Sequence, residues 1–443
     1  MIVTKTTQGE AGGPPAILPS ARGPVAAALG TYWFGVTLWK RIFLGMALGV
    51  GAGLLLGDQA EQIRWIGDLF IRLIRMLVTP LVFATIVAGV VSMGDIRRLG
   101  GVGVKTVFLY FVTTLIGAAL GLGLGALARP GAGVVLGQPT EAPAVAAPLS
   151  LTDQFLAIVP MNPVAALAEG DILAVIFFAI IFGLAVLTAG ETGRPVARAF
   201  ASLADVMQKM TRGVMEVAPF GVFALIAWVT GVVGPAAFIH VFLLAVCVLV
   251  GCALQVLVVH GGLIRLAAGL PVTPFLRDIA DAVVVAFSTS SSAATLPVVM
   301  RVAEENLGVS RVVASTSLPI GVTVSMDGTA MYVGLLAMFA AQAFGVEVTL
   351  LQGLLVIISI AVIAVGSAPV PSASLFLLAG VLQTLGLGPE QTAMVVGFIL
   401  PFDRILDMMR TVPNCTSDLA VAVTVAKWEG ELDKDVYLAK PTT

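Results

Sequence analysis

Long stretches without a single charged residue recur along this chain, and each is long enough to cross a bilayer as a helix. A transmembrane helix needs roughly 20 apolar residues. With 58% hydrophobic and 11% charged residues and a mean hydropathy of +1.03, the composition is that of a polytopic membrane protein. The uncharged runs lie between Arg41 and Asp58, Arg75 and Asp95, Lys105 and Arg129, Asp171 and Glu191, and across residues 217–264. Because the last run has room for two spans, these runs predict six helices.

Clusters of Lys and Arg alternate with nearly uncharged loops, which indicates the orientation of the spans. Basic residues gather near Lys40, Arg97, Arg198 and Arg265. By the positive-inside rule, we expect a multi-pass protein of the inner (plasma) membrane with both termini in the cytoplasm. Residues 1–36 are rich in Gly, Pro and Ala and lack a signal-peptide pattern, so they are interpreted as a flexible cytoplasmic tail.

The sequence argues against several other classes of function. A net charge of −2 gives no basic footprint for a nucleic-acid partner. Cys247, Cys252 and Cys415 form no CxxC pair and are interpreted as packing residues. His240 and His260 lie in an apolar run, far from any serine or acidic partner, and no HExxH motif is present. We therefore expect neither an enzyme nor a cofactor.

Two later segments combine short apolar arms with a polar centre. They read DAVVVAFSTSSSAATLPVVMR and GLLVIISIAVIAVGSAPVPSASLFLLAGVL. Each arm is too short to cross a bilayer, and polar backbone facing lipid at mid-depth would cost several kcal/mol for each unmade hydrogen bond. We therefore predict two re-entrant helical hairpins whose tips line a wet cavity. The alternative for each segment is one full helix whose serines bond to its own carbonyls.

Each hairpin precedes an apolar segment that carries charge. The first, SLPIGVTVSMDGTAMYVGLLAMF, contains Asp327, and the second, PFDRILDMMRTVPNCTSDLAVAV, contains a polar stripe. At helical spacing the stripe consists of Asp403, Asp407, Arg410, Asn414 and Asp418. A hairpin followed by an interrupted helix, twice, predicts an internal repeat, and inverted repeats with broken helices are typical of secondary transporters.

The residue types in the stripe indicate a site for an acidic substrate. Arg410 offers a planar fork that binds a carboxylate through two hydrogen bonds. Asp407 offers a charge for an ammonium group, and Thr411 and Asn414 add neutral groups. The simpler interpretation is that Asp407 and Arg410 pair with each other at i and i+3. Charges at the centre of a bilayer are costly, which favours a functional role.

Several motifs occur in a fixed order and give a specific resemblance. RMLVTPLVFATIVAG is followed by NPVAALAEGDILAVIFFAIIFG, APFGVFALIA, STSSSAATLP, SMDGTAMY and DRILDMMRTVPNCTSD. From about Arg41 to Lys427 the chain resembles the glutamate transporter family, the dicarboxylate/amino acid:cation symporters. The resemblance implies an all-α protein with eight transmembrane helices, two re-entrant helical hairpins in inverted repeats, a homotrimer and an elevator-type motion.

On this basis the chain is divided into five parts. They are a cytoplasmic tail at 1–36, transmembrane helices 1–3 at 37–128, helices 4–6 with scaffold and trimerisation elements at 155–264, a transport core at 272–428, and a second cytoplasmic tail at 429–443. The core would contain hairpin 1, helix 7, hairpin 2 and helix 8.

The resemblance also extends the substrate site beyond the stripe. Asp407, Arg410, Thr411 and Asn414 would hold substrate groups in the last helix. The further residues implied are Ser291 and Ser292 of the first hairpin, Thr329 of the SMDGTA segment and Val370 of the second hairpin.

Asp418 and Asp327 have no substrate group left to meet, which makes them candidates for a cation held by carboxylate and carbonyl oxygens. The resemblance implies three Na+ sites: Asp418 with Gly321, Ser325 and Asn414; Asp327 with Tyr110, Thr113 and Thr114; and backbone around Thr323, Val365 and Ser367. Proton-coupled family members commonly carry Asn at the position of Asp418. Na+ is therefore the expected coupling ion, with H+ as the alternative.

Three residues depart from the family pattern. Ser325 stands where Asn usually precedes Met-Asp-Gly-Thr, which puts the cation site around Asp327 in question. Pro369 stands in a hairpin that is usually rich in glycine, so that lid would be stiffer. Pro413 interrupts the last helix and either frees a carbonyl for a ligand or makes a packing kink.

Arg404 is one further charge beside the stripe. Family members usually carry an additional arginine at the first hairpin tip or in the last helix, and the hairpin position here is Ser290. Arg404 either balances the charge of Asp403 or Asp407 or extends to the outer interface.

The predicted function is secondary active symport of an acidic amino acid, aspartate or glutamate, with Na+. The alternative within the class is a proton-coupled C4-dicarboxylate or glutamate symporter; a dicarboxylate carrier would not need Asp407 for an ammonium group. A channel or passive anion pore is a third interpretation, which counterflow separates because only a carrier exchanges labelled for unlabelled substrate. The expected partners are the small acidic substrate, the lipid bilayer and other copies of the chain in a homotrimer.

Overall fold

The computed structural model describes residues 36–92, 100–134, 159–234, 237–364 and 373–439, and every regular element in these residues is a helix. Up to residue 267 the helices are α2 (Leu38–Leu56), η2 (Gly57–Ile63), α3 (Arg64–Ser92), α4 (Gly100–Ala128), α6 (Pro163–Glu169), α7 (Ile172–Thr188), η3 (Gly190–Gly193), α8 (Arg194–Met215), α9 (Ala218–Trp228), η4 (Val229–Val233), α10 (Ala237–Leu254), η5 (Gln255–His260) and η6 (Leu263–Ala267). After residue 267 they are α11 (Val272–Asp278), α12 (Ala280–Thr289), α13 (Ser292–Arg301), η7 (Val302–Asn306), α14 (Arg311–Val324), α15 (Asp327–Ala343), α16 (Leu350–Ala364), α17 (Ala373–Thr384), α18 (Pro389–Glu429) and α19 (Lys434–Leu438).

Several of these helices are long and apolar enough to cross a membrane. In the described part of the chain there are four such stretches: Leu38–Val91, Gly101–Ala128, Phe238–Ala267 and Arg311–Ala343. A fifth candidate consists of Gly190–Met215 and Ala218–Val232, which meet at a bend of 51°. The expectation of an all-helical chain with several apolar helices is confirmed. The total of eight spans remains a prediction.

The helix α8 was not predicted from the uncharged runs. Its sequence RPVARAFASLADVMQKMTRGVM carries basic residues at both ends and one acidic residue between them. It therefore contains no uncharged stretch of bilayer length, although it forms one arm of the bent pair.

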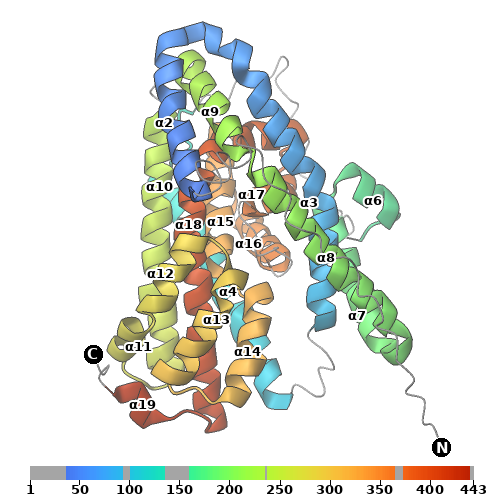
Figure 1. Ribbon diagram of the computed structural model, residues 1–443, viewed down its shortest axis with the longest axis vertical. Coiled ribbons are helices and arrows are strands. Elements are labelled where there is room, and N and C mark those ends of the chain that lie inside the picture. Colours follow the sequence, from blue (N-terminus) through green and yellow to red (C-terminus); the bar gives the residue numbers. More distant parts are fainter. Residues whose placement is uncertain (1–35, 93–99, 135–158, 235–236, 365–372, 440–443) are drawn as a thin grey trace, which may run out of the picture.

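Two groups of helices can be followed in Figure 1. In one group, α3, α7 and α8 pack side by side and extend away from the rest of the molecule. In the other, α18 contacts α4, α10, α12, α14 and α15. Residues 413–426 of α18 are all buried. The last long helix therefore forms the centre of the core.

The two charged segments that follow the predicted hairpins differ in structure. Between α14 and α15 the chain leaves the helical conformation at Ser325, with ψ of 91°, and at Met326, with φ of −120°. In contrast, α18 runs for 41 residues through Pro401 and Pro413. The expected interruption of the last helix at Pro413 is therefore wrong. A proline removes one N–H and kinks a helix, but packing against neighbouring helices keeps the adjacent turns of this buried segment intact.

The first predicted hairpin segment consists of two helices of 10 residues each, α12 and α13, that pack against each other. They meet at Ser290, whose left-handed φ of 52° ends α12. Ser291 then caps α13 by accepting the amide of Ala294. The segment is therefore two helices and not one, and its re-entrant placement in a membrane remains a prediction. In the second segment α16 packs against α17, and the tip at 365–372 lies outside the described residues.

The end of the described chain folds back onto the core. The short helix α19 contacts α11, and the hydroxyl of the fully buried Tyr437 donates to the Pro271 carbonyl at 2.8 Å. Arg277 donates to the Ala439 carbonyl at 2.6 Å. The segment expected as a second tail is therefore packed against α11 as far as Ala439.

A row of glycines brings α4 close to α15. Gly117, Gly121 and Gly125 recur every four residues on α4. A Cβ atom at Gly117 would lie 2.8 Å from the Asp327 carbonyl oxygen, and one at Gly121 would overlap the Met331 carbonyl. Small residues at this spacing let two helices approach closely in a membrane. The crossing therefore places the beginning of α15 against the middle of α4.

The variant Gly121→Ala is expected to lower the melting temperature of the protein in detergent, because its methyl group meets the Met331 carbonyl. Overpacking of this kind costs about 1–3 kcal/mol. Gly123→Ala is the matched control, since a Cβ there has no atom within 4 Å. Alanine gains up to about 1 kcal/mol of helix propensity at either position. Equal melting temperatures for the two variants would contradict the close crossing.

Candidate functional site

The polar stripe of α18 lies entirely inside the protein. Its residues Asp403, Asp407, Arg410, Asn414 and Asp418 are at most 5% exposed. Steps of three or four residues place them on one face of the helix, as the sequence predicted. Tyr332, Gly328 and Thr329 of α15 contact this face.

Arg410 is held by two aspartates of its own helix. Its Nη1 donates to Asp403 Oδ1 at 3.0 Å, and its Nη2 donates to Asp407 Oδ1 at 2.5 Å. The guanidinium carbon lies 4.6 Å from the ring centroid of Tyr332, whose hydroxyl donates to Asp403 Oδ1 at 2.9 Å. Buried charges are tolerated when they are paired and hydrogen-bonded. The pairing of Asp407 with Arg410 that the sequence allowed is present in this geometry.

Arg404 extends the same charge cluster. The residue is 8% exposed, and its Nη1 lies 3.7 Å from Asp407 Oδ2. Within the described residues its Nε and Nη1 make no hydrogen bond. Of the two interpretations offered by the sequence, charge balance for Asp407 agrees with this burial, and extension to the outer interface does not.

Asn414 joins α18 to the beginning of α15. Its Oδ1 accepts the amide of Gly328 at 2.8 Å and that of Thr329 at 3.4 Å, and its Nδ2 donates to Thr329 Oγ1 at 3.3 Å. Amides in the first turn of a helix have no intrahelical partner. Asn414 therefore caps α15 from another helix, which the sequence did not predict. Thr411 donates to the Asp407 carbonyl of its own helix at 2.7 Å.

Some of the remaining predicted substrate and cation residues lie in the described part of the chain, and others lie outside it. Ser291 and Ser292 lie at the start of α13, and both helices of that hairpin segment pack against α18. Thr323 donates to a carbonyl of its own helix. The residues outside the described part of the chain are Val365, Ser367 and Val370, together with Pro369. Their contributions stay predictions.

Asp418 has an unsatisfied oxygen. The residue is 1% exposed, and its Oδ1 has no hydrogen-bond partner among the described residues. A Cβ at Gly321 would overlap both Asp418 Oδ1 and the Tyr110 hydroxyl, so only glycine fits between them. The Tyr110 hydroxyl donates to the Ser317 carbonyl at 3.2 Å. Leaving a buried acceptor unpaired is costly, and a cation at this oxygen would remove that cost.

Asp327 has the opposite environment, because both of its oxygens have partners. Oδ1 accepts from Thr114 at 2.9 Å and from Thr113 at 3.1 Å, both on α4. Oδ2 accepts from Gln255 Nε2 at 3.1 Å and lies 3.0 Å from His260 Nε2. The structure thus brings two of the three predicted α4 residues to Asp327 and adds two that the sequence analysis missed.

The expectation that His260 lies far from any acidic partner is wrong. It is fully buried between Asp327 Oδ2 and Thr416 Oγ1, each at 3.0 Å. These partners lie 67 and 156 residues away along the chain, so the local sequence does not show them. The available signal was the residue type, because an ionisable residue in a membrane span usually faces the protein interior and pairs there. His240 instead lies 3.3 Å from the Pro130 carbonyl.

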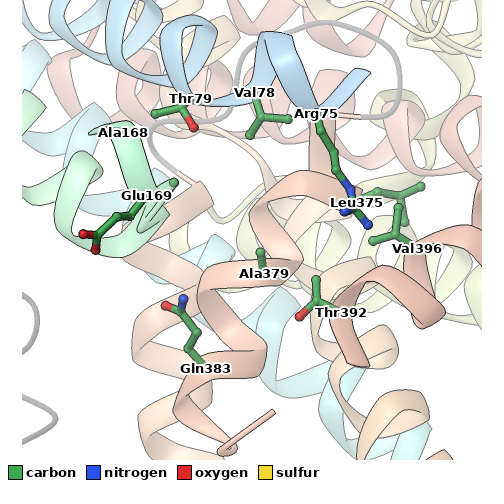
Figure 2. Close-up of a pocket in the computed structure, with 11 residues that line it drawn as sticks. Arg75, Val78, Thr79, Ala168, Glu169, Leu375, Ala379, Gln383, Thr392 and Val396 are labelled. Carbon is green, nitrogen blue, oxygen red and sulfur yellow. The ribbon is translucent and has the colours of Figure 1, made fainter. Parts of the chain in front are cut away.

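A cavity of about 350 Å³ is lined by residues that do not belong to the stripe, and Figure 2 shows this lining. Its lining includes Arg75 and Thr79 of α3, Glu169 of α6, Gln383 of α17 and Thr392 of α18. None of the predicted substrate or cation residues in the described chain lines it. The cavity therefore lies between the α3 group of helices and the core.

Comparison with known proteins decides the family. The sequence model that describes the sodium:dicarboxylate symporter family matches residues 38–428 of this chain. The chain belongs to this family. The resemblance inferred from the ordered motifs is thereby confirmed, and the chain is a member of a family of membrane transporters.

Relatives in the sodium:dicarboxylate symporter family differ in their named substrates and ions. The chain is 35% identical over 404 residues to the proton/sodium-glutamate symport protein of Bacillus subtilis (strain 168), covering 89% of this chain and 93% of that protein. It is 34% identical over 405 residues to the C4-dicarboxylate transport protein of Anaeromyxobacter sp. (strain K), covering 90% and 91%. It is 33% identical over 421 residues to the proton/glutamate-aspartate symporter of Escherichia coli (strain K12), covering 90% and 94%.

The variant Asn414→Ala is expected to lower the free energy of unfolding by about 1–2 kcal/mol, because two amides of α15 lose their acceptor. The measurement is the melting temperature in detergent. Thr424→Ala is the control on the same buried helix, since the Thr424 hydroxyl donates to the Ala420 carbonyl of its own helix. An equal fall in both variants would show that Asn414 does not cap α15.

Proposed function

We propose that this family member takes up an acidic amino acid, aspartate or glutamate, together with Na+ by secondary active symport. The observation that carries the proposal is the buried stripe of α18. It combines the guanidinium of Arg410, the carboxylate of Asp407 and an oxygen of Asp418 that has no hydrogen-bond partner among the described residues, all on one helix. The family supplies the class of transport, and the stripe supplies groups for a substrate carboxylate, for the substrate ammonium and for a cation.

An exchange of partners at Arg410 would admit the substrate. Arginine binds a carboxylate through two parallel N–H donors, and Arg410 already uses such donors on Asp403 and Asp407. A substrate carboxylate that replaces Asp407 at Nη2 would free the Asp407 carboxylate to receive the substrate ammonium. One carboxylate and the ammonium of an acidic amino acid would then each meet an opposite charge.

The charges of the site favour binding a cation together with the substrate. The formal charges of Asp403, Arg404, Asp407 and Arg410 sum to zero. Asp418, further along the same helix, adds one negative charge. An acidic amino acid brings one more net negative charge into this buried region. Na+ at Asp418 Oδ1 would offset it, because hard cations prefer oxygen ligands, so binding of ion and substrate would support each other.

A second candidate is a proton-coupled C4-dicarboxylate or glutamate symporter. The observation that favours a dicarboxylate is the position of Asp407, which lies between Arg410 at 2.5 Å and Arg404 at 3.7 Å. A carboxylate engaged by two arginines is less available to an ammonium group. Two arginines in one buried cluster also suit a substrate with two carboxylates.

The finer architecture belongs to the same proposal. We propose eight transmembrane helices, two re-entrant hairpins, a homotrimer in the plasma membrane with both termini in the cytoplasm, an elevator-type motion and no enzymatic activity. The contacts of α4 and α10 with α15 and α18 favour a moving unit that includes these two helices beside residues 272–428. The α3 group, across the cavity of Figure 2, would form part of the scaffold.

The test of this function is uptake into proteoliposomes of the purified protein. Labelled aspartate, glutamate and succinate are compared under an imposed Na+ gradient and under an imposed H+ gradient. Aspartate or glutamate uptake driven by Na+ supports the proposal, whereas succinate uptake driven by H+ supports the second candidate. Counterflow is run alongside, and its absence would favour a channel over a carrier.

The variant Arg410→Cys is expected to reduce uptake of labelled aspartate about 100-fold or more. Removing one partner of a buried ion pair costs about 3–5 kcal/mol, and no other cation of the stripe replaces it. Uptake of small neutral amino acids is measured in parallel, since the smaller side chain leaves room for them. Arg301→Cys, which removes an exposed arginine paired with Asp281, is the control. Unchanged aspartate uptake in Arg410→Cys would overturn the substrate assignment.

The variant Asp418→Asn keeps the size of the side chain and removes its charge. We expect the Na+ concentration for half-maximal aspartate uptake to rise about tenfold or more, because losing one charged ligand is worth at least about 1.4 kcal/mol. Asp281→Asn removes a carboxylate that pairs with Arg301 at the surface and is the control. The same Na+ dependence in wild type and in Asp418→Asn would show that Asp418 is not part of the cation site.

A further inference from the structure

His260 lies where three parts of the core meet. It ends the π-helical turn η5, which continues α10, and it is fully buried. Its Nε2 lies 3.0 Å from Asp327 Oδ2 of α15, and its Nδ1 lies 3.0 Å from Thr416 Oγ1 of α18. A carboxylate only accepts hydrogen bonds. Nε2 therefore donates to Asp327. The Thr416 hydroxyl beside Nδ1 also donates to the Pro413 carbonyl at 3.2 Å.

The π-helical turn is what allows two residues of one segment to reach Asp327. In an α-helix, residues five apart point about 140° away from each other around the axis. A π-helical turn bonds residue i to residue i+5 and brings such residues to the same side. Gln255 and His260 are five apart, and both contact Asp327 Oδ2, at 3.1 Å and 3.0 Å.

The four side chains around Asp327 differ in what they can offer a cation. Thr113 and Thr114 reach Oδ1 with hydroxyl oxygens, which have lone pairs for an ion. Gln255 and His260 each reach Oδ2 with an N–H group. An N–H group repels a cation. A cation therefore has ligands on the Oδ1 side of the carboxylate, and the Oδ2 side is closed.

We propose that His260 is a positioning residue for a coupling cation at Asp327, beside the one proposed at Asp418, an inference that rests on the proposed Na+ symport. Its N–H bond to Oδ2 fixes the rotation of the carboxylate so that Oδ1 faces Thr113 and Thr114. Thr416 fixes the imidazole in turn. Because Thr416 stands two residues from both Asn414 and Asp418, the same contact ties this carboxylate to the substrate helix.

Two amide variants separate positioning from packing. In His260→Gln the amide nitrogen reaches the place of Nε2 and keeps the donor to Asp327. In His260→Asn the shorter amide reaches the place of Nδ1 and keeps only the contact with Thr416. The control is His240→Asn in α10, the helix that η5 continues, where the histidine lies near the Pro130 carbonyl.

Two readouts are measured for each variant. One is the Na+ concentration that half-saturates aspartate uptake in proteoliposomes, with choline replacing Na+. The other is the rise in melting temperature that NaCl alone produces in the detergent-purified protein, which reports binding of the ion to the folded state. Residues that hydrogen-bond to a metal ligand without touching the ion typically contribute about 10–100-fold in ion affinity. We expect His260→Asn to need at least about tenfold more Na+ in both readouts, while His260→Gln and His240→Asn stay within about threefold of wild type.

The KM for aspartate at saturating Na+ should be unchanged in all three variants, since His260 contacts no predicted substrate residue among the described ones. Equal Na+ dependence in His260→Asn and wild type would overturn the inference, and so would equal shifts in His260→Asn and His260→Gln. A wild-type protein that transports acidic substrates without responding to Na+ also overturns it and leaves a proton-driven carrier. If the wild type transports none of the acidic substrates, the proposed function fails, and the NaCl melting shift still tests the role of His260.

Discussion

The burial of charge inside α18 is the constraint on which the rest of the structure depends. A helix that carries Arg410, Asp403 and Asp407 in an apolar interior is tolerated only if these charges meet partners. Two of these partners are on the helix itself, and Tyr332 of α15 supplies a hydrogen bond and an aromatic face. The neighbouring helices must therefore pack around α18 closely enough to exclude solvent, and Asp403, Asp407 and Arg410 are each at most 3% exposed.

Two buried carboxylates in the core differ in how the cost of burying their charge is offset. Asp327 receives side-chain partners from α4 and η5 on both oxygens, so its charge is distributed over a local network. Asp418 keeps one oxygen without a partner in the described chain. The break between α14 and α15 lies close to both residues, because Asp327 begins α15 and Asp418 Oδ1 lies beside Gly321 near the end of α14. Backbone groups at helix ends have no intrahelical partner. The glycine crossing of α4 and α15 is what brings the first of these networks together.

Much of the fold and part of the site could be predicted from the sequence, because both depend on local pattern. Uncharged runs predicted α2, α4 and α7, and the three- and four-residue spacing predicted the stripe of α18. The prediction failed where tertiary packing opposes a local rule. Pro413 should interrupt a helix by itself, yet α18 continues through it because the surrounding helices bury that turn. The helix α8 was not predicted because the charged residues along its sequence leave no uncharged run of bilayer length.

By itself the sequence determined that the chain is an all-helical membrane protein, that it belongs among the dicarboxylate and amino-acid symporters, and that one helix carries a line of charge. Each of these follows from composition, periodicity or ordered motifs within short windows. Only the tertiary structure decided which groups meet across helices. Asn414 caps α15, and His260 and Gln255 hold Asp327, through contacts between residues 67 to 86 positions apart. No local pattern encodes such contacts, because they depend on how the helices cross.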